Sequence, residues 1–137
     1  MKKISASLSS SRKLGVRSKI WFVRGNDHVF GYGLACLLKQ VERVGSLRQA
    51  AELEGMSYRY AWGEIRAAEK HLGMRLLVRS KGGRGGGGSS LSPEGMKLLR
   101  IFSEEEERVR TYADEQFEEL LMEEPATANQ RRRCAKF

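Results

Sequence analysis

Residues 46–73 read SLRQAAELEGMSYRYAWGEIRAAEKHLG and contain two short helical patterns joined by a glycine. Ser46 and Ser57 can each cap a helix, because a serine hydroxyl accepts a hydrogen bond from a free backbone N–H of the first turn. Gly55 can form the turn between the helices, since a residue without Cβ adopts a positive φ at little cost. Gly73 can end the second helix as a left-handed cap. The pattern predicts a helix-turn-helix, a unit whose second helix enters a groove of DNA.

The second helix of this unit has an apolar face and a basic face. Ala61, Ile65, Ala68 and Leu72 recur at i, i+4, i+7 and i+11, which predicts one stripe that packs in the core. Arg59, Gly63, Arg66 and Lys70 follow the same spacing two positions earlier, so the basic residues lie on the side of the helix that can face DNA. An amphipathic surface helix with solvated charges would show the same pattern, so the preceding helix and the following loop must be considered with it.

The N-terminal turn of the second helix carries the residues best suited to reading bases. Arg59 can bond the O6 and N7 atoms of guanine, and Tyr58 can bond a phosphate or pack on a thymine methyl group. Gly63 would allow close approach of the helix backbone to DNA. We expect Trp62 to be a packing residue rather than a base contact, because its apolar area is large. The expected DNA-binding residues are Arg48, Ser57, Tyr58, Arg59, Tyr60, Gly63, Arg66 and Lys70, with Lys81 and Arg84 from the following loop.

A glycine-rich loop with two flanking strands follows the second helix. Leu76–Arg79 and Ser89–Leu91 have strand character, and the loop between them contains KGGRGGGG. We interpret this region as the wing of a winged helix, in which Lys81 and Arg84, with Arg79 at the base, reach the DNA backbone or an adjacent groove. A hairpin tip without a binding role is the alternative. The loop formally matches G-x-G-x-x-G, but a dinucleotide site needs a helix directly after the loop, and here a strand follows.

Two further elements are expected before the helix-turn-helix. Lys19–Arg24 has the β-branched and aromatic residues of a short strand. Residues from about Val29 to Val44 have helical spacing, and Gly45 closes that helix. These elements predict a mainly α fold with a small β component, a winged helix-turn-helix over residues 18–93 between a flexible basic tail, residues 1–17, and a long helix.

The long helix begins at Ser92-Pro93-Glu94, where serine caps and proline is tolerated at the first helical position. It can run over residues 94–123, about 45 Å at roughly 1.5 Å per residue, before a basic tail at 124–137. Its apolar side needs a partner, and a second copy would supply one in a C2 dimer. The expected dimerisation residues are Leu98, Phe102, Val109, Tyr112, Phe117, Leu120 and Leu121. The alternative is that the helix packs back on its own domain, and we expect its first turns, around Met96–Phe102, to do so.

Charge is distributed unevenly along the chain. The net charge of +8 combines +11 over residues 1–93, where 17 Lys and Arg face 6 Asp and Glu, with −7 over residues 94–124 and +4 in the last residues. A phosphate-facing surface is therefore expected in the first two-thirds, and the acidic helix should point elsewhere.

Several other classes of protein are disfavoured. The sequence has no run of about 18 apolar residues for a transmembrane helix, and its basic N-terminus lacks the apolar core of a signal peptide. Cys36 and Cys134 cannot form a C-x-x-C site and are expected to be reduced thiols in the cytoplasm. His28 and His71 are far apart in sequence and have no further ligands at metal-binding spacing. We therefore expect no enzyme activity and no metal or cofactor. The expected partners are double-stranded DNA and a second copy of the chain, and no membrane association is expected.

The segments GSLRQAAELEGMSYRYAW (45–62) and GMRLLVRSKGGRGGGGSSLSPEG (73–95) closely resemble the N-terminal winged-helix domain of ModE-type, molybdate-responsive transcriptional regulators. The most specific features are S-Y-x-x-A-W on the second helix, the poly-glycine wing, and L-(S/T)-x-x-G after it. LysR-type DNA-binding domains share the skeleton but typically lack these features. The resemblance implies a dimer that binds a palindromic operator, with residues 57–60 and the wing in contact with DNA. We expect this dimer to act as a repressor.

One part of the family pattern is missing from these 137 residues. Regulators of this type carry C-terminal β-barrel modules that bind molybdate or tungstate, and the tail segment Thr127–Gln130 cannot make an oxyanion site. We expect the DNA-reading part without the ligand-sensing part. A protein-interaction adaptor that acts through the acidic helix, and a small oxyanion sensor, remain as alternative functions.

Overall fold

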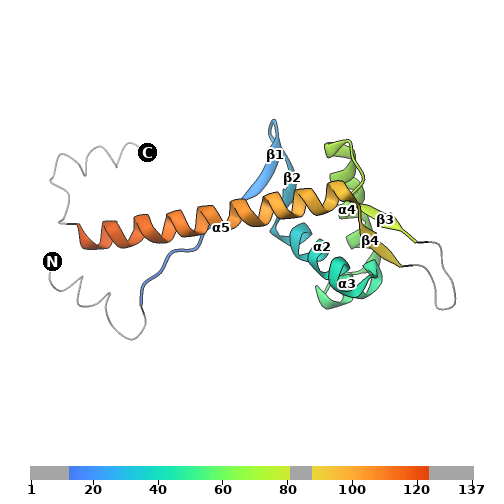
Figure 1. Cartoon of the computed structure of the whole chain (residues 1–137), viewed down its shortest axis with the longest axis horizontal. Helices are drawn as coiled ribbons and strands as arrows, with labels where there is room; N and C mark the ends of the chain where they lie inside the picture. The colour runs from blue at the N-terminus through green and yellow to red at the C-terminus, as the bar shows by residue number, and fades with distance from the viewer. Residues whose placement is uncertain (1–12, 81–87, 124–137) are drawn as a thin grey trace. The chain divides into compact units, whose positions relative to one another are not determined.

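The structure, a computed structural model, describes residues 13–80 and 88–123. Residues 19–107 form one compact unit, and the last helix continues from residue 108 into a second unit. None of the helices in the described ranges has the length and apolar character needed to cross a bilayer. The elements form the mainly α, winged helix-turn-helix fold that the sequence predicts. In chain order they are β1 (Trp21–Arg24), β2 (Asp27–Gly31), α2 (Tyr32–Val44), α3 (Leu47–Leu53), α4 (Tyr58–Leu72), β3 (Leu77–Arg79), β4 (Ser89–Leu91) and α5 (Pro93–Met122) (Figure 1).

Helices α3 and α4 form the predicted helix-turn-helix. The Ser46 hydroxyl oxygen accepts a hydrogen bond from the Gln49 N–H at 3.2 Å, and so caps α3. The Ser57 hydroxyl oxygen accepts one from the Tyr60 N–H at 3.1 Å, and so caps α4. Gly55 between the helices has a φ of +69°, in the left-handed region that favours glycine. Both predicted caps and the predicted turn are therefore confirmed.

The segment before α2 is a strand, whereas the sequence predicted a helix from about Val29. β2 pairs antiparallel with β1, with Phe22 opposite Phe30 and an irregular register after Phe22. Helix α2 begins only at Tyr32, and β1 begins at Trp21, two residues later than predicted. The helix prediction was wrong here because long-range pairing and packing bury Val29 and Phe30, and the spacing of nearby apolar residues does not reveal such contacts.

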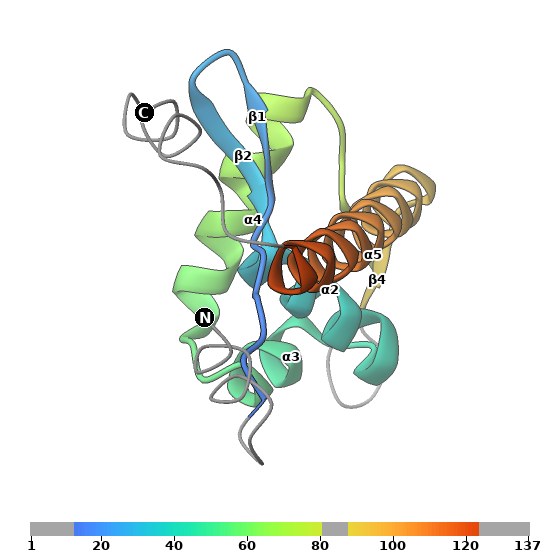
Figure 2. The ribbon, with the colours of Figure 1, turned by 90° about the vertical axis from the view of Figure 1, so that its left-hand side faces the viewer.

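The β1–β2 hairpin lies beside α4 (Figure 2). The Arg24 guanidinium donates a hydrogen bond from Nη1 to the carbonyl oxygen of His71 at 2.7 Å. His71 lies in the last turn of α4, where carbonyl groups have no partner within the helix. The hairpin therefore supports the C-terminal end of α4.

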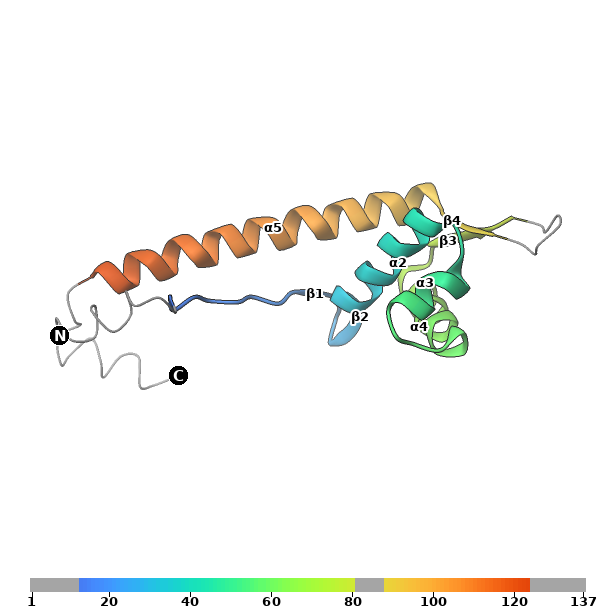
Figure 3. The same cartoon turned by 90° about the horizontal axis from the view of Figure 1, so that it is seen from below.

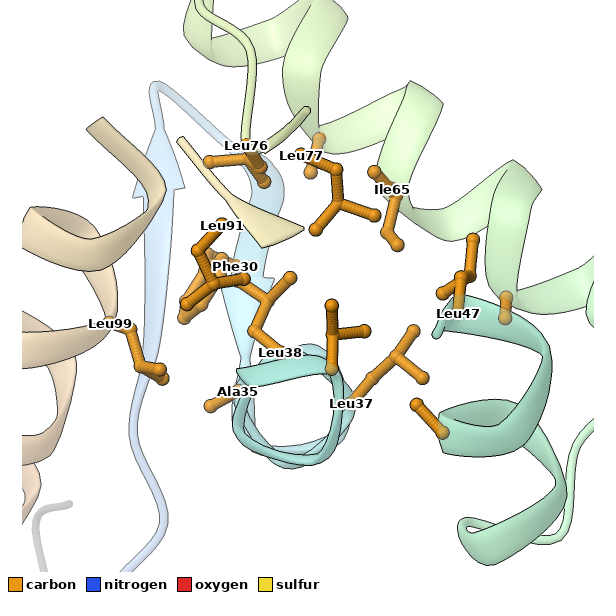
Figure 4. Packing of buried hydrophobic residues seen from close by; sticks show 14 of the residues in the cluster. Phe30, Ala35, Leu37, Leu38, Leu47, Ile65, Leu76, Leu77, Leu91 and Leu99 are labelled. Carbon is orange, nitrogen blue, oxygen red and sulfur yellow. The ribbon is translucent and has the colours of Figure 1, made fainter. Parts of the chain in front are cut away.

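Side chains from the helices, β2 and the two wing strands converge on one hydrophobic core (Figure 4). Phe102 of α5 is fully buried, and its ring meets those of Phe22 and Phe30 edge-on, with centroids 5.3 and 5.2 Å away. Leu98 also packs against this core. The first turns of α5, around Met96–Phe102, pack on their own domain as expected. Phe102 was also expected at a dimer interface, and that was wrong, because its ring is enclosed by aromatic side chains of its own domain. The first turns of α5 thus belong to the winged-helix domain.

Strands β3 and β4 form the predicted wing strands. They pair antiparallel, with Leu77 opposite Leu91 and Arg79 opposite Ser89. The pair extends away from α2, α3 and α4 (Figure 3). Ser89 is also tied to the end of α2, because its N–H donates a hydrogen bond to the Gly45 carbonyl oxygen at 2.9 Å.

The backbone of Leu76 connects α4, the wing and α5. Its N–H donates a hydrogen bond to Oε1 of Glu69 at 3.1 Å, and its carbonyl oxygen accepts one from the Ser92 N–H at 2.9 Å. The Ser92 hydroxyl oxygen accepts a hydrogen bond from the Gly95 N–H at 2.9 Å, and so caps α5. A Cβ on Gly95 would overlap the Leu76 carbonyl oxygen. The start of α5 can therefore approach the strand only through a glycine, which accounts for the L-S-x-x-G motif.

We expect Gly95→Ala to lower the free energy of unfolding by about 1–3 kcal/mol, because the added methyl group overpacks a contact with backbone. Gly63→Ala is the matched control, since Gly63 is also inside a helix but a Cβ there would meet no atom within 4 Å. That variant should gain about 0.5–1 kcal/mol from helix propensity. Urea unfolding of the two variants measures both effects, and stabilisation by Gly95→Ala would contradict the close approach.

Candidate nucleic-acid interface

The outward face of α4 presents basic side chains. Arg59, Arg66 and Lys70 are exposed, and within the described ranges none of them forms an ion pair. Gly63 lies between them and leaves the helix backbone open, since no atom would contact a Cβ built there. The opposite face of the helix packs into the core, as its apolar spacing predicts. This face is therefore positively charged and accessible to an anionic partner.

The N-terminal turn of α4 lies between two arginines from other elements. Tyr58 is half-buried, and Cζ of Arg48, on α3, lies 4.7 Å from the centroid of its ring. Arg79, on β3, donates a hydrogen bond from Nη2 to the Tyr58 hydroxyl oxygen at 2.8 Å. The structure thus brings together side chains from both helices of the helix-turn-helix and from the wing.

Trp62, one turn further along α4, extends this arrangement. It packs against the core, as expected, and Cζ of Arg79 lies 4.1 Å from its ring centroid. Cζ of Arg66 lies 5.7 Å from the same centroid. Both distances are within the range of cation–π attraction. We refer to Arg48, Tyr58, Arg79, Trp62 and Arg66 as the arginine–aromatic cluster.

Trp62 was not expected to contact DNA, and Arg79 was expected to do so only from the base of the wing. The sequence carries a signal for Trp62, because Tyr58, Trp62 and Arg66 are spaced by four residues and so share one side of the helix. For Arg79 the sequence indicates a place at the base of the wing but not the contacts with Tyr58 and Trp62, which depend on the path of the chain into β3. The arginine–aromatic cluster is therefore a product of the tertiary structure.

The other expected site residues are placed as follows. The Ser57 hydroxyl serves as a helix cap, and Tyr60 on the same turn is 58% exposed. Lys81 and Arg84 lie outside the described residues. Their expected contact with DNA stays a prediction.

A pocket of about 370 Å³ lies between the β1–β2 hairpin, the start of α2 and the C-terminal half of α4. His28 and His71, far apart in the sequence, both line it. Among the described residues, no group of three His, Cys, Asp or Glu side chains is arranged to hold a metal ion. Tyr32 also lines the pocket, and a hydrogen bond with the Cys36 side chain raises the pKa of its phenol, with smaller contributions from nearby charges. The Tyr32 phenol is therefore neutral near pH 7.

Residues 35–96 match the family model of the bacterial regulatory helix-turn-helix proteins of the lysR family. The matched range covers α3, α4, the wing and the first residues of α5, together with most of α2. This region of the chain is therefore similar to the lysR-type helix-turn-helix proteins. The matched region contains all five residues of the arginine–aromatic cluster.

The chain is also similar to proteins named ModE. It is 39% identical over 66 residues to "Transcriptional regulator ModE" of Yersinia pestis, covering 48% of this chain and 25% of that protein. It is 36% identical over 66 residues to "DNA-binding transcriptional dual regulator ModE" of Escherichia coli K12, with coverages of 48% and 25%. It is 34% identical over 99 residues to "Molybdenum transport protein ModE" of Herbaspirillum seropedicae, with coverages of 72% and 36%. The expected resemblance is confirmed, and the chain spans a quarter to about a third of these relatives.

These relatives are transcriptional regulators or a transport protein by name, and none of the three is named as an enzyme. Among solved structures, ArgP from Mycobacterium tuberculosis is similar with a TM-score of 0.44 and 21% identity, covering 65% of this chain and 30% of that one.

Ser57→Ala should lower the free energy of unfolding by about 1 kcal/mol, because the Tyr60 N–H loses its partner at the start of α4. Ser57→Asp is the matched control, since aspartate also caps and its charge is favourable at a helix N-terminus. Thermal unfolding of both variants measures the difference. A cap role would be contradicted if the alanine variant were as stable as the aspartate variant.

Proposed function

We propose that this chain is a sequence-specific DNA-binding transcriptional regulator, acting in the cytoplasm, with α4 in the major groove. The observation that carries the proposal is the exposed basic face of α4 in a lysR-type helix-turn-helix domain with a wing. The excess of Lys and Arg over residues 1–93 supplies attraction to phosphates. The names of the Yersinia and Escherichia relatives support the same role.

Arg59 is the side chain we propose to read a base. It is exposed on the first turn of α4, and its planar guanidinium matches the O6 and N7 acceptors of guanine. Lys70 and the wing residues Lys81 and Arg84 would contact phosphates, since a flexible ammonium or a glycine-rich loop is better suited to charge attraction than to base selection.

We further propose that α5 pairs with α5 of a second copy through its C-terminal half. Tyr112 and Leu120 are each 65% exposed there, and an exposed apolar stripe on one helix marks a surface that a partner can cover. Val109, Phe117 and Leu121 recur at helical spacing beside them. A C2 dimer would cover these residues and present two copies of α4 to a palindromic operator. A dimer bound to that operator would repress transcription.

The proposal is limited to DNA binding and dimerisation. This chain covers 36% of the length of the relative named for molybdenum transport. Thr127–Gln130, the tail segment considered in the sequence analysis, lies outside the described residues.

Selection of bound duplexes from a random pool should yield a two-fold symmetric sequence, with half-sites about 34 Å or a multiple apart. Arg59→Ala should weaken binding to the selected duplex about 5- to 150-fold, the range for losing one bidentate base contact of roughly 1–3 kcal/mol. It should weaken binding to a scrambled duplex much less. Fluorescence anisotropy at about 150 mM salt measures both affinities.

Arg100→Gln is the control for loss of one positive charge, because Arg100 is an exposed arginine on α5 that pairs with Glu104. Its affinity should stay within about twofold of wild type. Equal losses by Arg59→Ala on both duplexes would exclude base reading. Absence of any sequence preference in the wild type would favour the protein-interaction adaptor.

Gly63→Ala should weaken binding to the selected duplex about tenfold while stabilising the fold, because a methyl group would stand between the open backbone of α4 and the groove. Competition binding at the same salt concentration measures the effect. Unchanged affinity would mean that the backbone at Gly63 does not approach DNA closely.

A further inference from the structure

We propose that the arginine–aromatic cluster is a preassembled site for one phosphate of the DNA backbone, in which Arg79 and the Tyr58 hydroxyl are ligands. The proposal rests on the proposed function, because the phosphate belongs to bound DNA. It assigns a role to Arg79 and Trp62 that the lysR-type fold and the names of the relatives do not.

The direction of the hydrogen bond at Tyr58 is the first step of the argument. A guanidinium has five N–H donors and no acceptor, so the bond from Arg79 Nη2 to the Tyr58 oxygen occupies a lone pair of that oxygen. The phenolic proton of Tyr58 is therefore left to be donated elsewhere. A group that accepts from Tyr58 would also meet the remaining N–H groups of Arg79.

The charge of the cluster is the second step. Three guanidinium groups surround two rings, and within residues 13–80 and 88–123 none of the three forms an ion pair. Stacking occupies the face of a guanidinium and leaves the N–H groups at its edge free. Uncompensated positive charge with free, planar donors matches the oxygens of a phosphate, which arginine binds in bidentate fashion.

The rigidity of the cluster is the third step. Its arginines come from three elements, Arg48 from α3, Arg66 from α4 and Arg79 from β3, and each lies over a ring of α4. Side chains that are already held lose less conformational freedom on binding. Because the guanidinium of Arg79 is held between Tyr58 and Trp62, it is better placed to bind a fixed backbone group than to adapt to different bases. The phosphate would then fix the register of α4 and of the wing together.

The test uses Tyr58→Phe, which keeps the ring under Arg48 but removes the hydroxyl, and Arg79→Gln, which removes the guanidinium. Both should weaken binding about tenfold, by the same factor on the selected duplex and on a scrambled duplex of equal length. Arg79→Gln should also reduce the slope of log affinity against log salt by about one. The double variant should lose less than the product of the single losses, because both groups serve one phosphate. Arg100→Gln should stay within about twofold of wild type.

A scan with neutral methylphosphonates along the selected duplex locates the contact. One position in each half-site should weaken binding of the wild type, weaken binding of Tyr58→Phe less, and have little effect on the double variant. Wild-type affinity of both variants, with only their melting temperatures lowered, would overturn the proposal and leave the cluster a purely structural link. Loss confined to the selected duplex would overturn it in favour of base reading. If the wild type bound no duplex even at low salt, the proposed function would fail as well, so the two failures are distinguishable.

Discussion

The contact between the start of α5 and the backbone of Leu76 is the constraint on which the arrangement of the winged-helix domain depends. Leu76 is held from two sides, by the Glu69 carboxylate at the end of α4 and by the N–H of Ser92 before α5. The absence of a side chain at Gly95 allows this approach. Because these bonds fix where β3 begins, they also fix Arg79, three residues later, over the ring of Trp62. A local backbone contact thus positions a side chain of the candidate interface.

The aromatic packing around Phe102 has a comparable effect at the other side of the domain. The rings of Phe22 and Phe30 come from the β1–β2 hairpin, and Phe102 comes from α5, more than 70 residues later. Burial of the Phe30 and Phe102 rings, with Phe22 partly buried against them, contributes strongly to stability and makes the first turns of α5 part of the core. The hairpin in turn supports the end of α4 through Arg24. Both ends of α4 are therefore braced by elements outside the helix-turn-helix.

This bracing matters for the proposed function because a helix that reads bases must be presented in one orientation. Arg59, which we propose reads a base, lies on an exposed turn, whereas the arginine–aromatic cluster beside it is held by cation–π contacts and hydrogen bonding. In this arrangement a rigid phosphate site would set the register, and a freer side chain would test the base. The two kinds of contact separate affinity from specificity, as in many DNA-binding proteins.

Local chemistry was sufficient to predict the helix-turn-helix, its serine caps, its glycine turn, the apolar stripe of α4 and the wing strands. Each of these depends on residues within a few positions of one another, where hydrogen bonding, φ preference and side-chain spacing act directly. Three features could not be predicted in this way: the strand at Val29 and Phe30, the packing of the Phe102 ring against Phe22 and Phe30, and the position of Arg79 on Trp62. These depend on contacts between residues 8 to more than 70 positions apart, and only the packed fold brings such residues together.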